Sequence, residues 1–557
     1  MVRRFSPFFA ILITAVALAL RLYGLKWGLP NMDHYFSYHP DETTILEAAQ
    51  RIDFFSGQID PGFYNYGSLY IYLVYIAIFM GMGWGLIVLG KRDPELIVRG
   101  YAQMYLAGRV VALLMGVATV LLVYYVGRRM YGRRTGLIAA VFMAILPIHV
   151  MHSHFLAVDV PATFFVTCSL LFASRIPEEK SRTRYYLLSG LFAGFSAATK
   201  YNAGLVVLAP IVAHLSKGGS FFRRLMSLNL LLVIIGLAAG FLIGCPGAVL
   251  NSESFLRGFL YEAHHVQTGH GLLFAETGSG FIYHLIHSLL PGMGLPIMVL
   301  ALAGVIYAIR KWTPQDAMLI AFLVPYYVLI GVAQVRFARY TMPILPPLVL
   351  LGARIPGKLM ERFEDERGFA RGVARVVTGA LTGLIVLYTL FYSISLDGVM
   401  AREDNRDAAL TWIRKNIPPG SSIAMPTIPW FYTPPLDPRF GYGSARARFE
   451  AAQSIAEYGI ITDESKEWNW RLLSEMEPEF VILSEFEYED RLRIGDQAAI
   501  DYFAVLDKKY RLVRQFDSPP SIFGKKFPLL VELPHDMSYA NPTIKIYARN
   551  DIVLSNG

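Results

Sequence analysis

The chain has 557 residues, of which 54% are hydrophobic and only 17% are charged. This composition is too apolar for a soluble globular protein and predicts a polytopic membrane protein. The net charge of +8 does not indicate nucleic-acid binding, because the basic residues fall in short loops between apolar segments. Cys168 and Cys245, the only two cysteines, lie in apolar segments, which argues against a disulfide framework or a cysteine metal site.

Apolar segments predict eleven membrane-spanning helices, each expected to need about 20 residues. They lie at roughly 7–27, 103–127, 136–152, 159–175, 185–201, 203–216, 222–245, 284–309, 315–333, 341–354 and 375–396. The first segment follows Arg3-Arg4 and has no small-residue cleavage site, so we interpret it as an uncleaved anchor. The expected fold class is mostly α, a polytopic transmembrane bundle of about eleven spans.

One further apolar run, residues 68–90, leaves the topology open. If this run stays on one side of the membrane, the later basic clusters share a face with Arg3-Arg4, and the positive-inside rule makes that face cytoplasmic. We therefore interpret 68–90 as an interfacial or re-entrant helix, with spanning as the alternative. The N-terminus is then cytoplasmic, the C-terminal region is extracytoplasmic, and the protein is a multi-pass protein of the plasma (inner) membrane.

The sequence His39-Pro40-Asp41-Glu42 places a histidine and two adjacent carboxylates just after the first apolar segment. Pro40 suits the first position of a helix, and apolar residues recur at helical spacing from residue 45 to residue 52. Asp41 and Glu42 are therefore expected in the first turn of an amphipathic helix. One explanation is that these acids only complement the helix dipole, and the other is that they carry chemistry.

Further polar residues are predicted to lie on the same external face as this motif. They are His154, Asp159, Lys200, His264, His265, Arg336, Arg339 and Tyr340. Lys200, Arg336 and Arg339 stand on the side of the membrane where basic residues are scarce. Each cation alone is explained by snorkelling to lipid headgroups, but three cations at the depth of three carboxylates favour an anion-binding site.

After residue 396 the chain becomes polar, and residues 397–557 are predicted to form a small α/β domain outside the membrane. The expected elements are a helix around 408–413, strands at 422–425, 480–483, 511–516 and 544–548, and a helix near 498–509. Trp468 and Trp470 are interpreted as membrane-interface anchors. Residues 1–396 form the membrane module, whose external loop 28–102 carries the catalytic candidates. The sequence has no Gly-rich phosphate loop and no Walker lysine, so ATP is not implied.

The order of several short motifs resembles the GT-C membrane glycosyltransferases. The motifs are HPDE at 39–42, HFLAVDVP at 154–161, AATKY at 197–201, RFARY at 336–340, MPILP at 342–346 and NRDAA at 405–409. Within this superfamily the chain is most similar to the bacterial type of the protein O-mannosyltransferase and lipid A aminoarabinose transferase branch. The chain lacks the Trp-Trp-Asp signature of oligosaccharyltransferases, which disfavours transfer of a whole oligosaccharide to asparagine.

The resemblance implies inverting transfer of a sugar from a polyprenyl-phosphate carrier to an acceptor on the outer face. By this resemblance Asp41 is the general base, Glu42 orients the acceptor or holds a cation, and Asp159 positions the acceptor or the sugar. The donor-phosphate candidates are Lys200, Arg336, Arg339 and Tyr340. Independently of the resemblance, a hydroxyl nucleophile needs a nearby carboxylate, and a leaving phosphate needs positive charge. The sugar and the acceptor, whether protein hydroxyl, lipid or glycan, stay open.

The histidines leave the question of a metal open. Candidates for contact with the acceptor or a metal are His39, His154, His264 and His265. Together with Asp41 or Glu42, imidazoles suit a divalent cation such as Zn or Mn, with Mg also considered, but adjacent histidines on a helix point in different directions. Two other functions are weighed, a transporter or flippase of polyprenyl-linked glycans and a non-catalytic scaffold of the same fold. The charges gather at one membrane edge and no internal repeat is visible, which favours the enzyme over a transporter.

Overall fold

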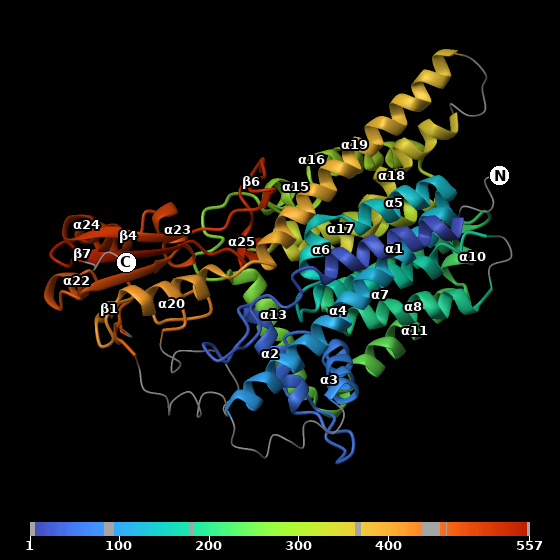
Figure 1. Cartoon of the computed structure of the whole chain (residues 1–557). Coiled ribbons are helices and arrows are strands. Elements are labelled where there is room, and N and C mark those ends of the chain that lie inside the picture. The colour runs from blue at the N-terminus through green and yellow to red at the C-terminus, as the bar shows by residue number, and fades with distance from the viewer. Residues whose placement is uncertain are drawn as a thin grey trace.

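The computed structural model describes residues 6–82, 94–178, 182–362, 369–436, 457–463 and 465–553. A helical bundle built from the first 400 residues lies beside an α/β domain built from the C-terminal residues (Figure 1). A short helix, α25 (His535–Ser538), returns from the C-terminal domain to the bundle. The mostly helical fold with a C-terminal α/β domain is as predicted.

The bundle consists of α-helices interrupted by a few turns of 3₁₀- and π-helix. Its α-helices are α1 (Ser6–Leu22), α2 (Pro40–Gln50), α3 (Leu69–Met82), α4 (Pro94–Tyr131), α5 (Arg133–Ala144), α6 (Pro147–His152), α7 (Asp159–Ala173), α8 (Arg184–Ala197), α9 (Leu208–Leu215), α10 (Phe221–Leu225), α11 (Leu228–Gly244), α12 (Gly247–Leu250), α13 (Ser252–Thr268), α14 (Gly280–Tyr283), α15 (Leu290–Met293), α16 (Leu295–Lys311), α17 (Pro314–Val332), α18 (Leu345–Arg362) and α19 (Phe369–Met400). The 3₁₀-helices are η2 (Tyr201–Val207) and η4 (Ala338–Ile344), and η3 (His284–Leu289) is a π-helix.

Four of the described helical segments are long and apolar enough to cross a membrane. They cover Val98–Tyr131, Phe221–Gly244, Pro314–Val332 and Ala370–Asn416. The protein is thus a multi-pass membrane protein, but the predicted count of eleven spans is not confirmed. Several predicted spans are divided into shorter pieces. Gly294, with a φ of +73°, separates α15 from α16, and Pro147 begins α6 after the break that ends α5.

The run at 68–90 forms α3 in its described part, and residues 83–93 lie outside the described residues. The 14 residues of α3 extend about 21 Å, which is less than the roughly 30 Å thickness of a bilayer core. Tyr70 and Val74 of α3 pack in one core cluster with Ile45 of α2 and Met104 of α4. An interfacial or re-entrant position for this helix therefore stays a prediction.

Helices α8 and α11 pack with their backbones in contact. A Cβ atom added at Gly190 would lie 2.1 Å from the carbonyl oxygen of Val233, and one added at Gly240 would lie 2.1 Å from that of Leu191. Both helices carry glycines four residues apart, which is typical of closely packed membrane helices. This packing fixes the C-terminal end of α8, just before Lys200.

The C-terminal domain is built on a five-stranded sheet of order β2-β1-β3-β7-β4. Its strands are β1 (Ser422–Ala424), β2 (Gly459–Ile461), β3 (Phe480–Ser484), β4 (Tyr510–Phe516) and β7 (Ile544–Arg549), and β5 (Ser521–Ile522) with β6 (Lys525–Lys526) forms a separate hairpin. Its longer helices are α20 (Asn405–Asn416), α22 (Arg471–Glu475), α23 (Glu485–Arg493) and α24 (Gln497–Lys509). Strand β1 is parallel to β2 and β3, whereas β7 is antiparallel to β3 and β4. The four predicted strands and both predicted helices are confirmed, and β2 was not predicted.

Helices cover both faces of this sheet. Successive side chains of β3 point to opposite faces and therefore enter two separate cores. Phe480 and Ile482 pack in the core on the α20 side, and the residues that alternate with them pack on the α24 side. Trp468 is fully buried on the α24 side, with its ring 5.3 Å from that of Tyr502. Its prediction as a membrane anchor is wrong, because the side chain lies in the core of the C-terminal domain. The stretch around Trp468 has no periodic pattern from which this core position could have been predicted. Trp470 is 36% exposed, and its anchor role stays a prediction.

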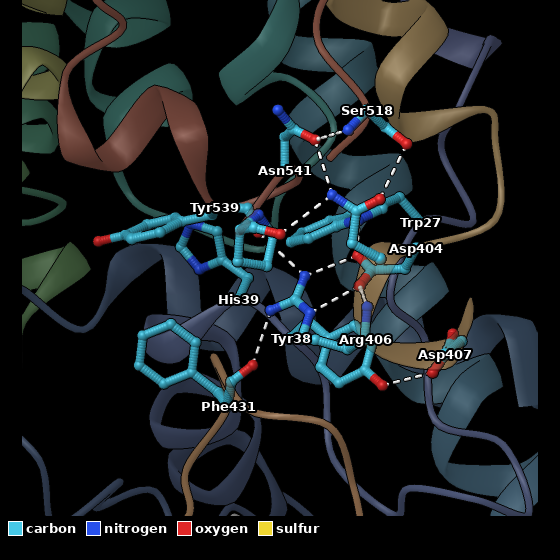
Figure 2. Close-up of polar contacts among 12 residues, drawn as sticks. Trp27, Tyr38, His39, Asp404, Arg406, Asp407, Phe431, Ser518, Tyr539 and Asn541 are labelled. Carbon is cyan, nitrogen blue, oxygen red and sulfur yellow. Dashed lines mark hydrogen bonds and ion pairs between the residues drawn. The ribbon is translucent and has the colours of Figure 1, made fainter. Parts of the chain in front are cut away.

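The first turn of α20 joins the two parts of the molecule, as Figure 2 shows. Arg406 is fully buried, pairs with Asp404 at 2.6 Å, and donates hydrogen bonds to the carbonyl oxygens of Phe431 and Tyr539 at 2.7 and 2.9 Å. Its guanidinium lies 3.8 Å from the ring centre of Tyr38, which belongs to the loop between α1 and α2 of the bundle. Since Phe431 and Tyr539 line the cavity described below, this junction fixes one wall of that cavity.

Candidate active site

The motif at 39–42 begins helix α2, as predicted. Pro40 occupies the first helical turn, and Nδ1 of His39 accepts a hydrogen bond from the backbone N–H of Asp41 at 3.3 Å. Burial lowers the pKa of His39 to about 3, so the neutral ring can accept this bond at physiological pH. His39, a candidate for acceptor or metal contact, is thus the N-cap of α2.

Glu42 lies in the protein core, where it is fully buried. Its carboxylate pairs with Arg109 of α4 through hydrogen bonds of 2.8 and 2.7 Å, and it accepts the backbone N–H of Leu156 at 2.7 Å and the hydroxyl of Ser37. Burial raises the pKa of Glu42, but Arg109 and the other donors lower it further, so it lies below the ordinary value. This geometry does not support the expected role of Glu42 in orienting the acceptor or holding a cation, because its carboxylate is buried and hydrogen-bonded to other groups of the protein.

Asp41 faces a cavity instead. Its side chain is 23% exposed, and Oδ2 lies 3.1 Å from Nη2 of Arg339. One residue changes direction by about 100° around a helix, which explains why two adjacent carboxylates enter different environments. Of the two acids in the motif, Asp41 is therefore the one that a substrate can reach.

Arg339, in the 3₁₀-helix η4, is surrounded by three carboxylates. In addition to Asp41, Asp159 places Oδ2 at 3.9 Å from its Nε, and Asp536 places Oδ2 at 3.7 Å from its Nη1. The guanidinium side chain is only 6% exposed. Such a buried cation needs several carboxylates around it, because burying an unpaired charge costs several kcal/mol.

Lys200 lies farther from the cavity than Arg339, which lines it. Its Nζ pairs with Oδ1 of Asp159 at 2.6 Å and lies 4.2 Å from the ring centre of Tyr340. Tyr340 lines the cavity, whereas Lys200 and Asp159 do not. The structure therefore brings the predicted residues together, with Asp41, Arg339 and Tyr340 at the cavity wall and the Lys200–Asp159 pair behind them.

The sequence analysis did not single out two residues of this arrangement. Arg109 had a signal, since it is a lone cation inside the apolar segment 103–127, where an ionisable residue is expected to have a partner. Asp536 had none, because nothing in the sequence connects a loop after residue 530 with Arg339. It is fully buried, and its two carboxylate oxygens accept the backbone N–H groups of Ala338 and Arg339 at 3.0 and 2.9 Å.

Replacing Asp536 by Asn is expected to lower the rate of the reaction at this site about 10- to 100-fold while the protein still folds. Asn turns an NH₂ group toward one of the two backbone N–H donors, and an unsatisfied buried donor costs about 1–3 kcal/mol. This cost is expected to displace η4 and with it the guanidinium of Arg339, which raises the barrier of the reaction. The measurement is kcat at saturating donor, with the exposed Asp507→Asn of the same domain as control. An unchanged kcat for Asp536→Asn would contradict its positioning of η4.

The cavity has a volume of about 530 Å³ and lies between the bundle and the C-terminal domain. The bundle contributes Asp41, Arg339, Tyr340 and His265 to its wall, and the C-terminal domain contributes mainly aromatic and acidic side chains. This volume is within the range of about 300–1,000 Å³ that is typical of small-molecule sites. The geometry therefore indicates a substrate site with a carboxylate and a guanidinium at its bundle side.

Two predicted site residues hold the backbone instead. Arg336 donates hydrogen bonds to the hydroxyl of Thr277 and the carbonyl oxygen of Gly278 at 2.7 and 2.8 Å. His154 contacts backbone carbonyl oxygens with both ring nitrogens, one of them that of Tyr23 at 3.0 Å. Neither side chain lines the cavity, and both stabilise turns near it.

The histidines near the cavity do not form a recognisable metal site. His264 is exposed on α13, whereas Nε2 of its neighbour His265 lies 2.9 Å from Nδ1 of His270. Glu262 approaches His265 only to 3.8 Å. Within the described parts of the chain, no three or more His, Cys, Asp or Glu side chains are grouped so that they could hold a metal ion. The described residues therefore do not fit the Mg, Mn or Zn site that the sequence left open.

Glu487 of α23 also lines the cavity, and its environment predicts a dependence of stability on pH. It accepts the hydroxyl of Thr427 at 2.5 Å and the backbone N–H of Ser484 at 2.7 Å, and burial raises its pKa from 4.5 to about 7. Because the unfolded chain loses this proton at the lower pKa, the folded state binds more protons between about pH 4.5 and 7. Its contribution to stability therefore falls as the pH rises through this window.

Glu487→Gln is expected to remove this contribution, which amounts to at most about 3 kcal/mol. Wild-type protein in detergent should lose more thermal stability between about pH 5 and pH 8 than the variant. The exposed Glu475→Gln of the same domain should behave like the wild type. Equal pH dependence of Glu487→Gln and the wild type would show that this carboxyl ionises normally in the folded protein.

Comparisons with known proteins concern the family and the fold of the chain. Residues 102–243 match the family model of dolichyl-phosphate-mannose-protein mannosyltransferase, and no curated protein matches the sequence. The chain is similar in structure to ArnT from Cupriavidus metallidurans bound to undecaprenyl phosphate, with a TM-score of 0.50 and 13% identity over 97% of this chain and 98% of that one. At such identity the likeness concerns the fold.

A second group of similar structures comes from Archaeoglobus fulgidus. Its oligosaccharyltransferase in the apo form has a TM-score of 0.50 and 14% identity, covering 97% of this chain and 77% of that one. The oligosaccharyltransferase AglB of that organism, in complex with an inhibitory peptide and a dolichol-phosphate, gives the same score, identity and coverage. The predicted resemblance to the GT-C glycosyltransferases is confirmed by the fold of nearly the whole chain and by the family match in its first half.

Proposed function

Because the chain has the GT-C glycosyltransferase fold and carries a mannosyltransferase family segment, we propose that it transfers a sugar from a polyprenyl-phosphate-linked donor to an acceptor hydroxyl. Transfer takes place at the extracytoplasmic face, where the predicted topology puts the C-terminal domain. The acceptor is a protein, a lipid or a glycan. ArnT was solved with undecaprenyl phosphate and AglB with a dolichol-phosphate, which supports a lipid phosphate as the carrier here.

The observation that carries the proposal is the pairing of Asp41 and Arg339 on the cavity wall, 3.1 Å apart. In the reaction, the acceptor oxygen bonds to the anomeric carbon while the bond from that carbon to the phosphate oxygen breaks. Asp41 takes the proton of the acceptor hydroxyl, and Arg339 stabilises the negative charge of the leaving polyprenyl phosphate. A single displacement of this kind inverts the anomeric configuration.

The Asp41–Arg339 pair also suggests an order of events. Arginine binds phosphate through charge-assisted hydrogen bonds, so the donor phosphate competes with Asp41 for Arg339. Nη2 of Arg339, which pairs with Asp41 at 3.1 Å, is the donor group for which the two anions compete. Donor binding then frees the Asp41 carboxylate to accept the proton.

Lys200 acts indirectly in this proposal. It was expected to bind the donor phosphate, but it lies behind Tyr340 and pairs with Asp159 at 2.6 Å. By neutralising Asp159, Lys200 leaves more of the charge of Arg339 for the donor. Asp159 in turn keeps Lys200 and Arg339 close together despite their equal charges.

The proposal is tested with purified protein in detergent, a radiolabelled polyprenyl-phosphate hexose and an extract of the host cell envelope. Label is expected to move from the donor to a component of the extract, and mass spectrometry of the product identifies the acceptor. Donor binding without transfer, for several sugars and with divalent cations supplied, would contradict the enzyme and favour the transporter or the scaffold.

A further inference from the structure

The cavity wall on the side of the C-terminal domain carries a row of aromatic rings. The row runs through Trp430, Tyr432, Phe486, His535 and Tyr539, and all five side chains line the cavity. The distances between successive ring centres are 6.0, 6.4, 4.7 and 5.1 Å. We call these five residues the aromatic strip.

One end of the aromatic strip lies beside the proposed catalytic pair. The ring of Tyr539 is 5.3 Å from that of His39, which caps the helix turn that carries Asp41. Arg406 holds the backbone of Tyr539 in this position through a hydrogen bond of 2.9 Å. A molecule lying along the strip therefore presents one end to the Asp41 carboxylate.

Carboxylates accompany the strip along the same cavity. Glu262, Glu467 and Asp490 line it, with side chains that are 20%, 53% and 28% exposed. Arg491 also lines the cavity and pairs with Glu467, and Arg493 pairs with Asp490 at 3.0 Å. The lining still holds more carboxylates than arginines, so an acceptor that carries phosphate, sulfate or carboxylate groups meets repulsion away from Arg339.

Aromatic rings with carboxylates beside them match the surface of a sugar. The C–H groups on one face of a pyranose carry small positive charges and pack on the negative face of an aromatic ring. The hydroxyl groups at its rim are donors, for which ionised carboxylates are strong acceptors. Among the described lining residues, only Pro40, Leu272 and Leu273 are aliphatic, which is little apolar surface for an acyl chain.

We propose that the aromatic strip is the acceptor subsite and that the acceptor is a saccharide without acidic groups. This inference rests on the proposed function and specifies its acceptor. The acceptor enters from the aqueous side, lies along the strip from Trp430 toward Tyr539, and offers a hydroxyl of its terminal sugar to Asp41. The cavity of about 530 Å³ limits the bound part to a few sugar rings.

The test measures acceptor binding in the absence of donor, so that it does not depend on catalysis. Equilibrium dialysis of the full-length protein in detergent uses tritiated chitotriose, maltotriose and mannotriose, a sulfated form of each, and a Ser/Thr-rich peptide. At least one neutral trisaccharide is expected to bind at least tenfold more tightly than its sulfated form and than the peptide.

Substitutions in the strip connect this binding to the proposed surface. Trp430→Leu and Tyr432→Leu are expected to weaken binding of the trisaccharide at least tenfold. Trp470→Leu is the matched control, because Trp470 lies in the same domain, is 36% exposed against 39% for Trp430, and does not line the cavity. Glu467→Gln removes one carboxylate from the cavity, together with its ion pair to Arg491, and is expected to weaken binding several-fold.

Each outcome decides the inference separately from the proposed function. Saccharide binding that Trp430→Leu weakens and Trp470→Leu leaves intact supports the inference, even if no donor sugar is transferred, in which case the proposed function fails alone. Preference for the peptide or for the sulfated sugars overturns the inference, and transfer of label to a protein would leave the proposed function standing. Saccharide binding that neither Trp430→Leu, Tyr432→Leu nor Glu467→Gln weakens also overturns it.

Discussion

Asp41→Asn is expected to lower the transfer rate by about 10²–10⁴-fold, because a positioned general base contributes about this factor. Asn has nearly the shape of Asp but cannot take the proton of the acceptor hydroxyl. The side chain lies at the cavity wall and is 23% exposed, so there is room for the amide. The measurement is the transfer of radiolabelled sugar at saturating donor.

The controls separate chemistry from folding and from donor binding. Asp53→Asn makes the same change in an exposed turn after the same helix and should keep the wild-type rate. Asp41→Asn itself should bind the donor at least as tightly as the wild type, since Arg339 has lost a competing carboxylate. A variant that binds the donor and transfers the sugar at the wild-type rate would rule out Asp41 as the base.

The neighbouring substitution, Glu42→Gln, is expected to destabilise the protein by about 3–5 kcal/mol, the usual cost of leaving a buried charge unpaired. The amide would leave Arg109 without its carboxylate and would turn a donor toward an N–H group or the guanidinium. We expect a large decrease in melting temperature or loss of the folded protein in detergent extracts.

A double-mutant cycle tests this explanation. If the cost arises from the orphaned charge of Arg109, the pair Glu42→Gln and Arg109→Gln together should be less destabilising than the sum of the two single changes. Strict additivity would show that the two side chains are not coupled. A Glu42→Gln protein that is as stable as the wild type but inactive would place Glu42 in the chemistry instead.

Asp41 lies at the cavity and Glu42 in the core, and this difference could not be predicted from the sequence. The motif predicted a helix that begins at Pro40, and the structure confirms it. It could not predict which acid faces the cavity, because that depends on how the helix is rotated against α4. Arg109 decides this, and it lies 67 positions from Glu42 along the chain.

The charged cluster was partly predictable for the same reason. Asp159, Lys200 and Arg339 each stand at the edge of an apolar segment, so the predicted topology alone places them at one depth. Asp536 could not be found, because it reaches Arg339 by a tertiary contact between domains, 197 positions apart in the chain. Local patterns contain no information on such a contact.

The fold was predictable where periodic patterns are long. The strands at 480–484 and 544–549 have strong apolar patterns and pair with each other at the centre of the sheet. The predicted count of eleven spans is not confirmed, since 3₁₀- and π-helical turns such as η2, η3 and η4 divide apolar segments without changing their composition. Hydropathy counts apolar residues but does not register such breaks.

The assignment of Asp41 as the base and of inversion as the outcome is tested most directly by chemical rescue with azide. Azide is a nucleophile that has no proton to lose, so it does not need a base. In Asp41→Asn, azide is expected to attack the anomeric carbon of the bound donor, release polyprenyl phosphate and restore donor consumption. The product should be a glycosyl azide with the anomeric configuration opposite to that of the donor. Failure of azide to restore consumption in a variant that still binds donor, or a product with the donor's own configuration, would contradict the mechanism.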